Sequence, residues 1–107
     1  MEFVFIKEKG GILTKVFVKD IFYLESQRDY VAVHTLEKRY MVHDILTDVA
    51  EKMPKGRFLR IHRSYMVQPS LVDRVEESSL FINGKRLSIG EKFRKELVEI
   101  INNNSIE

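Results

Sequence analysis

Short apolar runs alternate with polar residues along the first part of the chain, and turn signals separate the runs. Residues 30–35 show this pattern, because Val31 and Val33 would face one side of an extended strand and His34 the other. Gly10-Gly11 favours a tight turn, since glycine takes positive φ values at little cost. The pattern predicts strands over residues 1–8, 12–18, 21–25, 30–35 and 39–43, with a polar loop at 26–29 and a turn at 36–38.

The hydrophobic period then lengthens to that of a helix. Apolar side chains recur at helical spacing at Ile45, Leu46, Val49 and Met53. The carboxylate of Asp44 can accept a backbone N–H of the first helical turn. Pro54 disfavours a helical residue before it. The sequence therefore predicts a short amphipathic helix over residues 44–52, with Asp44 as its N-cap.

The second half of the chain returns to strand patterns and ends in a second helix. Asn83-Gly84 is typical of a type I′ hairpin turn, in which both central residues need positive φ. Strands are predicted over residues 58–61, 66–67, 71–76, 79–82 and 85–89, with a tight turn over 63–65. Apolar residues at helical spacing predict a helix over 91–101, followed by a frayed tail over 102–107.

Composition narrows the class of protein. The chain has 107 residues, 44% of them hydrophobic, which predicts one domain, residues 1–107, with a single modest core. It has no cysteine, and its three histidines are scattered, so we expect no disulfide, metal site or cofactor. No apolar run approaches membrane-spanning length, and no signal peptide is visible. We therefore expect a soluble, cytoplasmic protein.

Charge is distributed unevenly along the chain. The net charge is only +2, yet residues 52–72 contain no Asp or Glu and carry Lys55, Arg57, Arg60 and Arg63. Apolar residues such as Phe58 and Ile61 interleave with these cations, which indicates a folded segment rather than a disordered basic arm. A folded, acid-free basic stretch suits a polyanion such as nucleic acid.

The basic stretch also carries a resemblance. Residues 57–67, Arg-Phe-Leu-Arg-Ile-His-Arg-Ser-Tyr-Met-Val, resemble the signature of the LytTR family, the DNA-binding domain of many bacterial response regulators. Residues 20–34 and 83–97 fit the same family, so the resemblance runs from about Ile12 to Ile101. One departure is Gln68-Pro69, where the family usually has Asn.

The resemblance implies a mainly β, elongated assembly of small antiparallel sheets with a short mid-chain helix and a C-terminal helix. It implies sequence-specific binding of double-stranded DNA for bacterial transcription regulation. Family members read major grooves with their loops, usually at direct repeats occupied by two copies, and often bend the DNA. The family commonly follows a receiver domain of a two-component system; such a domain is not in this sequence, which fits an excised effector domain or a free-standing regulator.

Three loops of the sequence match the family's DNA-contacting regions: residues 26–30, the segment around 62–64, and residues 90–92. By resemblance, the predicted base contacts are Gln27, Arg28, Tyr30, Arg63 and Lys92. Arg63 is the strongest of these, because arginine can bond guanine O6 and N7 with two hydrogen bonds. The predicted phosphate contacts are Arg28, Arg60, His62, Ser64, Arg86, Arg94 and Lys95.

Structural roles for the same residues stay open at this point. Arg60 or Arg63 can instead pair with Glu25 or Asp73. His62 can be a packed, hydrogen-bonded histidine that orients a neighbouring loop. Tyr65 can belong to the core, Lys95 can be a solvated helix residue, and Glu91 can cap the last helix, where negative charge is favoured.

Other functional classes remain as alternatives. The sequence has no HExxH, Walker A or GxSxG motif, so we expect no catalytic residue and no enzyme. The main alternative is a β-rich protein-interaction module whose basic surface binds an acidic partner. A third is single-stranded RNA binding by exposed aromatic side chains, with Phe17, Phe22, Tyr23, Tyr40 and Phe81 as the candidates.

Overall fold

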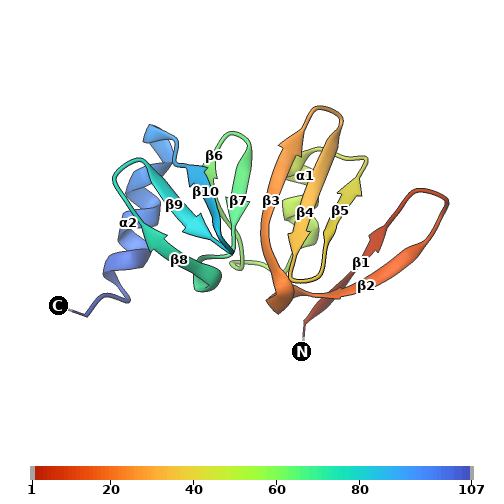
Figure 1. Ribbon diagram of the computed structural model, residues 1–107, viewed down its shortest axis with the longest axis horizontal. Helices are drawn as coiled ribbons and strands as arrows, with labels where there is room; N and C mark the ends of the chain where they lie inside the picture. The colour runs from red at the N-terminus through yellow and green to blue at the C-terminus, as the bar shows by residue number, and fades with distance from the viewer. Residues whose placement is uncertain (1, 107) are drawn as a thin grey trace.

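Three antiparallel sheets and two helices form an elongated body of 48 × 30 × 24 Å in the computed structural model, which describes residues 2–106 (Figure 1). The central sheet has five strands in the order β5-β4-β3-β7-β6, and it lies between a two-stranded ribbon, β1-β2, and a three-stranded sheet, β10-β9-β8. The strands are β1 (Phe3–Lys7), β2 (Leu13–Phe17), β3 (Ile21–Gln27), β4 (Tyr30–Thr35), β5 (Arg39–Val42), β6 (Leu59–His62), β7 (Tyr65–Val67), β8 (Val72–Val75), β9 (Ser79–Ile82) and β10 (Lys85–Ser88). The helices are α1 (Leu46–Lys52) and α2 (Arg94–Asn102), and short 3-10 turns lie at Val18–Asp20, Pro69–Leu71 and Glu91–Phe93. The mainly β, LytTR-like architecture expected from the resemblance is thus observed.

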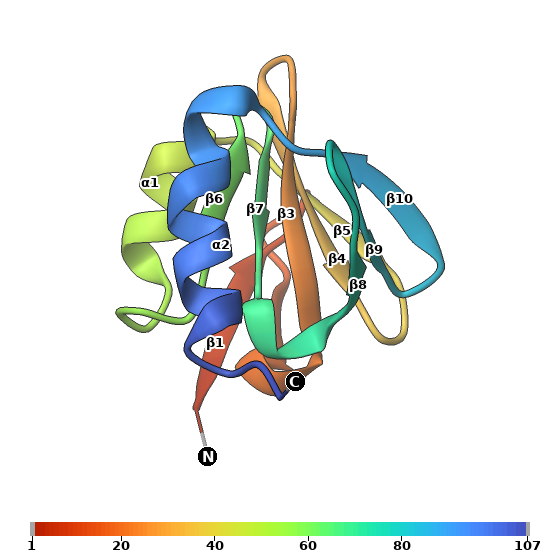
Figure 2. The same cartoon turned by 90° about the vertical axis from the view of Figure 1, so that its left-hand side faces the viewer.

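The central sheet buries apolar side chains on both faces. Alternation along β3 sends Leu24 to one core, with the ribbon and α1, and Tyr23 to the other, with the three-stranded sheet and α2. Both helices lie on the same side of the molecule, which is the far side in Figure 1 and the left side in Figure 2. The chain therefore has two hydrophobic clusters rather than the single core expected from its length.

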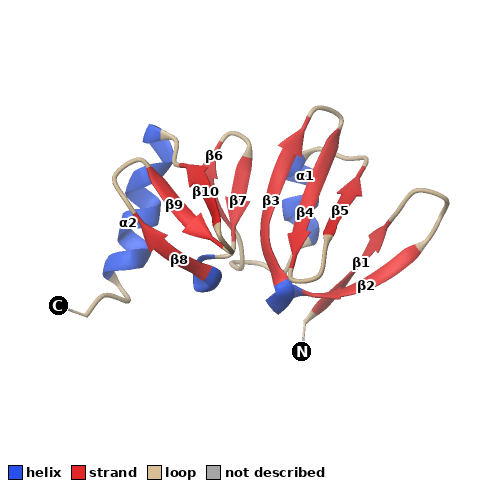
Figure 3. Cartoon of the chain, viewed as in Figure 1, coloured by secondary structure: helices blue, strands red, loops and turns tan. Residues whose placement is uncertain are grey.

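Most of the predicted elements are confirmed. The strands over 30–35 and 79–82 have the predicted bounds, and Asn83 and Gly84 have the positive φ values, 48° and 75°, of the predicted type I′ turn. Figure 3 shows the tight turns that join β3 to β4, β4 to β5 and β6 to β7. Met1, predicted in the first strand, and Glu107, predicted in the tail, lie outside the described residues. No described helix has the length and hydrophobicity needed to cross a membrane.

Both helix starts differ from the prediction. The first helix begins at Leu46 with Ile45 at its N-cap position, so Asp44 is not the N-cap. The Asp44 carboxylate instead accepts the N–H of Ile45 at 2.8 Å and a hydrogen bond from Lys52 at 3.1 Å, because Ile45 is extended and holds Asp44 away from the first turn. These two bonds lower the pKa of Asp44.

Residues 91–93 form a tight 3-10 turn, so the α-helical part of the second helix begins at Arg94. At the other end the predicted frayed tail begins too early. The helix includes Asn102, and backbone bonds from Asn103 to Glu99 and from Asn104 to Ile101 continue the turn.

Two strands extend further than their local sequence indicates. β3 continues through Gln27, which the sequence placed in a loop, and β7 begins at Tyr65, which the sequence placed in a turn. The reason is pairing between distant segments, since Glu25 lies opposite Tyr65 and the Ser26 N–H donates to the Ser64 carbonyl. These extensions shorten both loops to two residues, Arg28-Asp29 and Arg63-Ser64.

Candidate nucleic-acid interface

The three loops that the sequence matched to DNA contacts meet along one edge of the molecule, the upper edge in Figure 1. The β3–β4 and β6–β7 hairpin tips are neighbours, because β3 pairs with β7 and the Ser26 N–H lies 2.9 Å from the Ser64 carbonyl oxygen. The third loop joins them through the Gly90 N–H, which donates to the carbonyl of Ile61 at 2.7 Å. We call this edge, formed by residues 26–30, 62–64 and 90–92, the loop edge.

Gly90 leaves room for the Phe93 ring next to the third loop. A β-carbon at this position would lie 2.9 Å from the Phe93 ring and 3.6 Å from the Cα of His62. The first distance is closer than any side chain tolerates without movement. A side chain at this position would therefore displace the Phe93 ring, whereas the distance to His62 is that of an ordinary contact.

Three of the predicted base contacts are exposed cations on this edge. Arg28 occupies the β3–β4 tip with a φ of 57°, an uncommon backbone conformation for arginine. Arg63 occupies the β6–β7 tip, and within residues 2–106 its side chain has no hydrogen-bond or ion-pair partner. Lys92 lies on the third loop with its Nζ 5.1 Å from the centre of the Phe93 ring. Each loop thus presents one cation that a ligand can reach.

Arg60 braces the tip that carries Arg63. Its Nε donates to the carbonyl of His62 at 2.9 Å, and its guanidinium also donates to the carbonyl of Arg63. The ion pairs with Glu25 or Asp73 that the sequence left open do not occur for either arginine, since Glu25 bonds His34 and Asp73 accepts the N–H of Asn83. Arg60 therefore satisfies two backbone carbonyls of the β6–β7 tip.

His62 braces the same tip from within. Its Nδ1 accepts the backbone N–H of Ser64 at 3.0 Å, which requires the proton to be on Nε2 when the ring is neutral. Its ring centre lies 5.2 Å from that of Tyr65. The packed, loop-orienting histidine that the sequence left open is therefore observed, and Tyr65 is half-buried against the second core.

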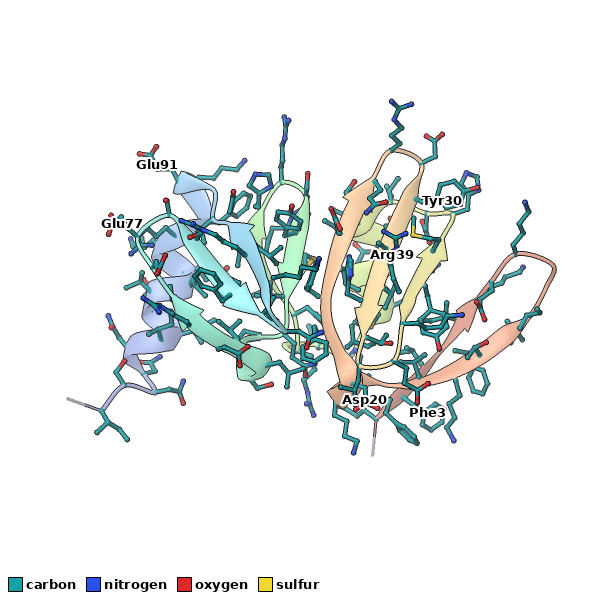
Figure 4. All side chains as sticks on the ribbon, viewed as in Figure 1. Phe3, Asp20, Tyr30, Arg39, Glu77 and Glu91 are labelled. Atoms are coloured by element: carbon teal, nitrogen blue, oxygen red, sulfur yellow. The ribbon has the colours of Figure 1, made fainter. Side chains whose placement is uncertain are left out.

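The remaining predicted contacts differ in their position and in their exposure to solvent. Gln27 and Ser64 are half-buried on the loop edge, and exposed Tyr30 lies there with its ring 5.1 Å from that of His43, a neighbour that sequence reasoning missed (Figure 4). Lys95 is exposed on α2.

Arg94 and Arg86 are engaged with the β8–β9 region. Arg94 donates to the carbonyls of Glu76, at 3.1 Å, and Glu77, and its second nitrogen lies 3.6 Å from the Glu77 carboxylate. The Nε of Arg86 donates to the Ser79 hydroxyl at 3.1 Å, and its guanidinium lies 5.7 Å from the centre of the Phe81 ring. Both arginines therefore have structural partners that the sequence did not indicate.

The sequence analysis also missed a group of polar side chains, His34, Glu25 and Tyr23, on the β3–β4 hairpin. The Nε2 of His34 lies 2.9 Å from Glu25 Oε1, and the His34 ring stacks on Tyr23 with centres 4.0 Å apart. Burial lowers the pKa of His34 despite the opposing effect of Glu25, so the imidazole is neutral at pH 7. Burial, with the charge of Glu25, raises the pKa of Tyr23 to about 12. The sequence contained a signal for this group, because the register of the β3–β4 hairpin places Tyr23 directly opposite His34.

The aromatic residues named as a platform for single-stranded RNA are not presented for stacking. Tyr23 and Tyr40 are buried, and Phe17, Phe22 and Phe81 are half-buried. Stacking platforms need exposed ring faces. These five residues therefore do not form such a surface, whereas the loop edge has the exposed cations that a duplex requires.

Comparison with known proteins agrees with this geometry. The family model of the LytTr DNA-binding domain matches residues 12–102. The chain belongs to the LytTR family. Membership makes it a DNA-binding domain of the type found in transcription regulators, and the segment matched includes all three loops of the loop edge.

Individual relatives are similar to parts of this LytTR chain. The sensory transduction protein LytT of Bacillus subtilis (strain 168) is 26% identical over 98 residues, which cover 86% of this chain and 41% of LytT. The transcriptional regulatory protein YpdB of Escherichia coli (strain K12) is 28% identical over 71 residues, which cover 66% of this chain and 28% of YpdB. The chain therefore spans less than half the length of either relative.

A solved structure shares the fold. The LytTr DNA-binding domain of a methyl-accepting/DNA response regulator from Bacillus cereus superposes with a TM-score of 0.76 at 20% identity, covering 94% of this chain and 97% of that one. At this identity the likeness concerns the fold, and it includes nearly the whole length of both chains.

Proposed function

We propose that this LytTR domain binds double-stranded DNA sequence-specifically, with its loop edge facing the bases of successive major grooves. The observation that carries this proposal is the convergence of Arg28, Arg63 and Lys92, one exposed cation from each of three loops that are distant in sequence. Arginine and lysine at hairpin tips can reach base edges, while a strand or helix behind them holds their position.

The residues divide by role. Arg63 reads guanine, and Gln27, Arg28, Tyr30 and Lys92 make the flanking base contacts. Phosphates are contacted by Arg60, His62, Ser64, Arg86, Arg94 and Lys95. For Arg60 and His62 the hydrogen bonds to the tip add a second role, which is to fix the backbone from which Arg63 projects. Preorganised side chains of this kind lose less entropy on binding.

The size of the body supports contact with more than one groove. Its longest dimension is 48 Å, and one turn of B-DNA is about 34 Å long. We propose that two copies occupy direct repeats and that the contacted DNA bends, so that deformability contributes to sequence preference. We also propose that the domain acts in a response regulator beside a receiver domain, as an effector without catalytic activity.

The experiment that tests the proposal is selection of bound duplexes from a random DNA library, followed by titration of the selected and scrambled duplexes at several salt concentrations. We expect an enriched motif with a preference of roughly a thousandfold or more over scrambled DNA. The slope of log affinity against log salt then gives the number of phosphates neutralised. Weak binding without an enriched motif would contradict sequence-specific recognition.

A further inference from the structure

The ribbon formed by β1 and β2 presents an apolar face that nothing in the DNA-binding proposal uses. Strand alternation points the even-numbered Val4, Ile6 and Val16 into the first core. The odd-numbered positions point the other way, and we call their side chains the ribbon face: Phe3, Phe5, Lys7, Leu13, Lys15 and Phe17.

The ribbon face is contiguous and exposed. Phe3, Phe5 and Leu13 are 49%, 58% and 62% exposed. The Phe3 and Phe5 rings meet edge to face with centres 6.0 Å apart, and the Nζ of Lys15 lies 4.7 Å from the Phe3 centre and 5.3 Å from the Phe17 centre. Contiguous exposed apolar surface on a small domain marks an interaction site.

The charges of the ribbon face are all positive. Its polar members are Lys7 and Lys15, and no outward position of either strand is acidic. The nearby acids are engaged elsewhere, since Glu2 pairs with Arg57, and Glu8 accepts a hydrogen bond from Thr14 and lies 3.6 Å from Lys38. Two copies joined through this face would bring lysines together, so charge complementarity favours a different, acidic partner.

The free edge of β2 supplies backbone groups for such a partner. Among the described strands β2 pairs only with β1. The bonds from Glu8 to Ile12, at 2.8 Å, and from Val18 to Glu2, at 3.1 Å, set the register of the ribbon. In that register the backbone N–H and C=O groups of residues 13, 15 and 17 point away from β1. The residues with free backbone groups are those with side chains on the ribbon face.

The location leaves the DNA-binding surface free. Phe3 lies at the lower end of the molecule in Figure 4, whereas Tyr30 and Glu91 of the loop edge lie at the upper end. The family model begins at residue 12, so β1, with Phe3 and Phe5, lies outside the matched segment. We therefore expect a partner at the Phe3 end of this face to leave the loop edge accessible to DNA.

We propose that the ribbon face binds an extended protein segment, which adds to the free edge of β2 as a third strand and in which every second side chain, apolar and acidic in turn, lies on the ribbon face. Main-chain bonds to β2 give affinity. A carboxylate beside Lys15, with apolar side chains beside Leu13 and Phe17, gives specificity.

The test titrates the isotope-labelled chain with a short peptide in which every second residue is valine, glutamate and valine in turn, with threonine between them, and follows backbone amide resonances. The same peptide with lysine in place of glutamate is the matched control. We expect saturable shifts at residues 13–17 with the acidic peptide only. Lys15→Glu should weaken binding of the acidic peptide by roughly tenfold, and it should create binding of the lysine peptide. Unchanged resonances outside the ribbon show that the variant is folded.

Three outcomes would overturn the proposal. Equal binding of both peptides would mean a nonspecific apolar surface, and no binding of either would remove the site. Stronger effects on the same resonances from vesicles of anionic lipid or from oligothymidine would assign the face to a membrane or to single-stranded nucleic acid. A duplex titration run in parallel with Lys15→Glu separates this result from the DNA-binding proposal, because the variant leaves the loop edge intact.

Discussion

The loop edge and the ribbon face are both exposed and basic, yet they are built differently. The loop edge stands on the five-stranded sheet, and its loops are held by hydrogen bonds that Arg60 and Gly90 donate and that His62 accepts. The ribbon face belongs to a two-stranded sheet, and one of its two lysines, Lys15, lies over a phenylalanine ring. Positive charge alone therefore does not define a DNA-binding surface; rigid, polar tips suit base edges, whereas an apolar face with a free strand edge suits polypeptide.

The largest expected effect is on the free energy of unfolding, and it compares the side chains that support each surface. Ile61 is fully buried under the β6–β7 tip, so Ile61→Ala should lower the free energy of unfolding by about 2–5 kcal/mol. Phe5→Ala on the ribbon face should change it by less than about 0.5 kcal/mol, because the ring is mainly exposed. Urea denaturation of both variants checks this. Equal losses would mean that the ribbon face is part of the core.

The next effect separates the surfaces by ligand. Arg63→Ala should weaken binding of the selected duplex by roughly 1–3 kcal/mol and relax preference at one base. Lys15→Ala removes a cation from the ribbon face and should leave the same affinity unchanged. Fluorescence anisotropy with single-base variants of the duplex measures both. If Arg63→Ala keeps full affinity and selectivity while folded, Arg63 does not read a base.

A smaller effect distinguishes bracing from phosphate contact at the loop edge. Arg60→Ala should reduce specific affinity by about 1 kcal/mol, because the carbonyls of the Arg63 tip lose their donor. If the main role of Arg60 is to hold the tip, the slope of log affinity against log salt concentration stays near that of the unaltered protein. A phosphate contact, as proposed for Lys95, reduces that slope by about one when replaced by alanine. A reduced slope for Arg60→Ala would assign Arg60 chiefly to phosphate.

The smallest effect concerns pH. The pKa of His34 is lowered on folding, so between that value and the ordinary 6.5 the unfolded chain binds more protons than the folded one. Stability from this residue is therefore fully present above pH 6.5 and declines as the pH falls below it. Thermal unfolding at pH 7.5 and 5.5 should show a larger loss for the unaltered protein than for His34→Gln. An equal loss would mean that another group causes the pH dependence.

Local sequence sufficed for much of the secondary structure. The Asn83-Gly84 turn was predictable because both residues tolerate the positive φ that the turn needs. The strand over residues 30–35 was also predicted with its observed bounds, although Val31, Ala32 and Val33 are buried on both of its faces. The helix starts were not, because Ile45 is extended and residues 91–93 form a 3-10 turn, and local sequence specifies helix boundaries only to within one or two residues.

The family motif also came from sequence, and with it the loops that are candidates for DNA contact. Only the tertiary structure decided how these residues cooperate. β3 and β7 are about forty residues apart, and their pairing brings the tip that carries Arg28 next to the tip that carries Arg63, extends both strands and aligns Ser26 with Ser64. The same is true of the bond from Gly90 to Ile61 and of Lys15 over the Phe3 ring. Periodicity and propensity report on neighbours along the chain, whereas a surface is made by segments that meet only after the core has formed.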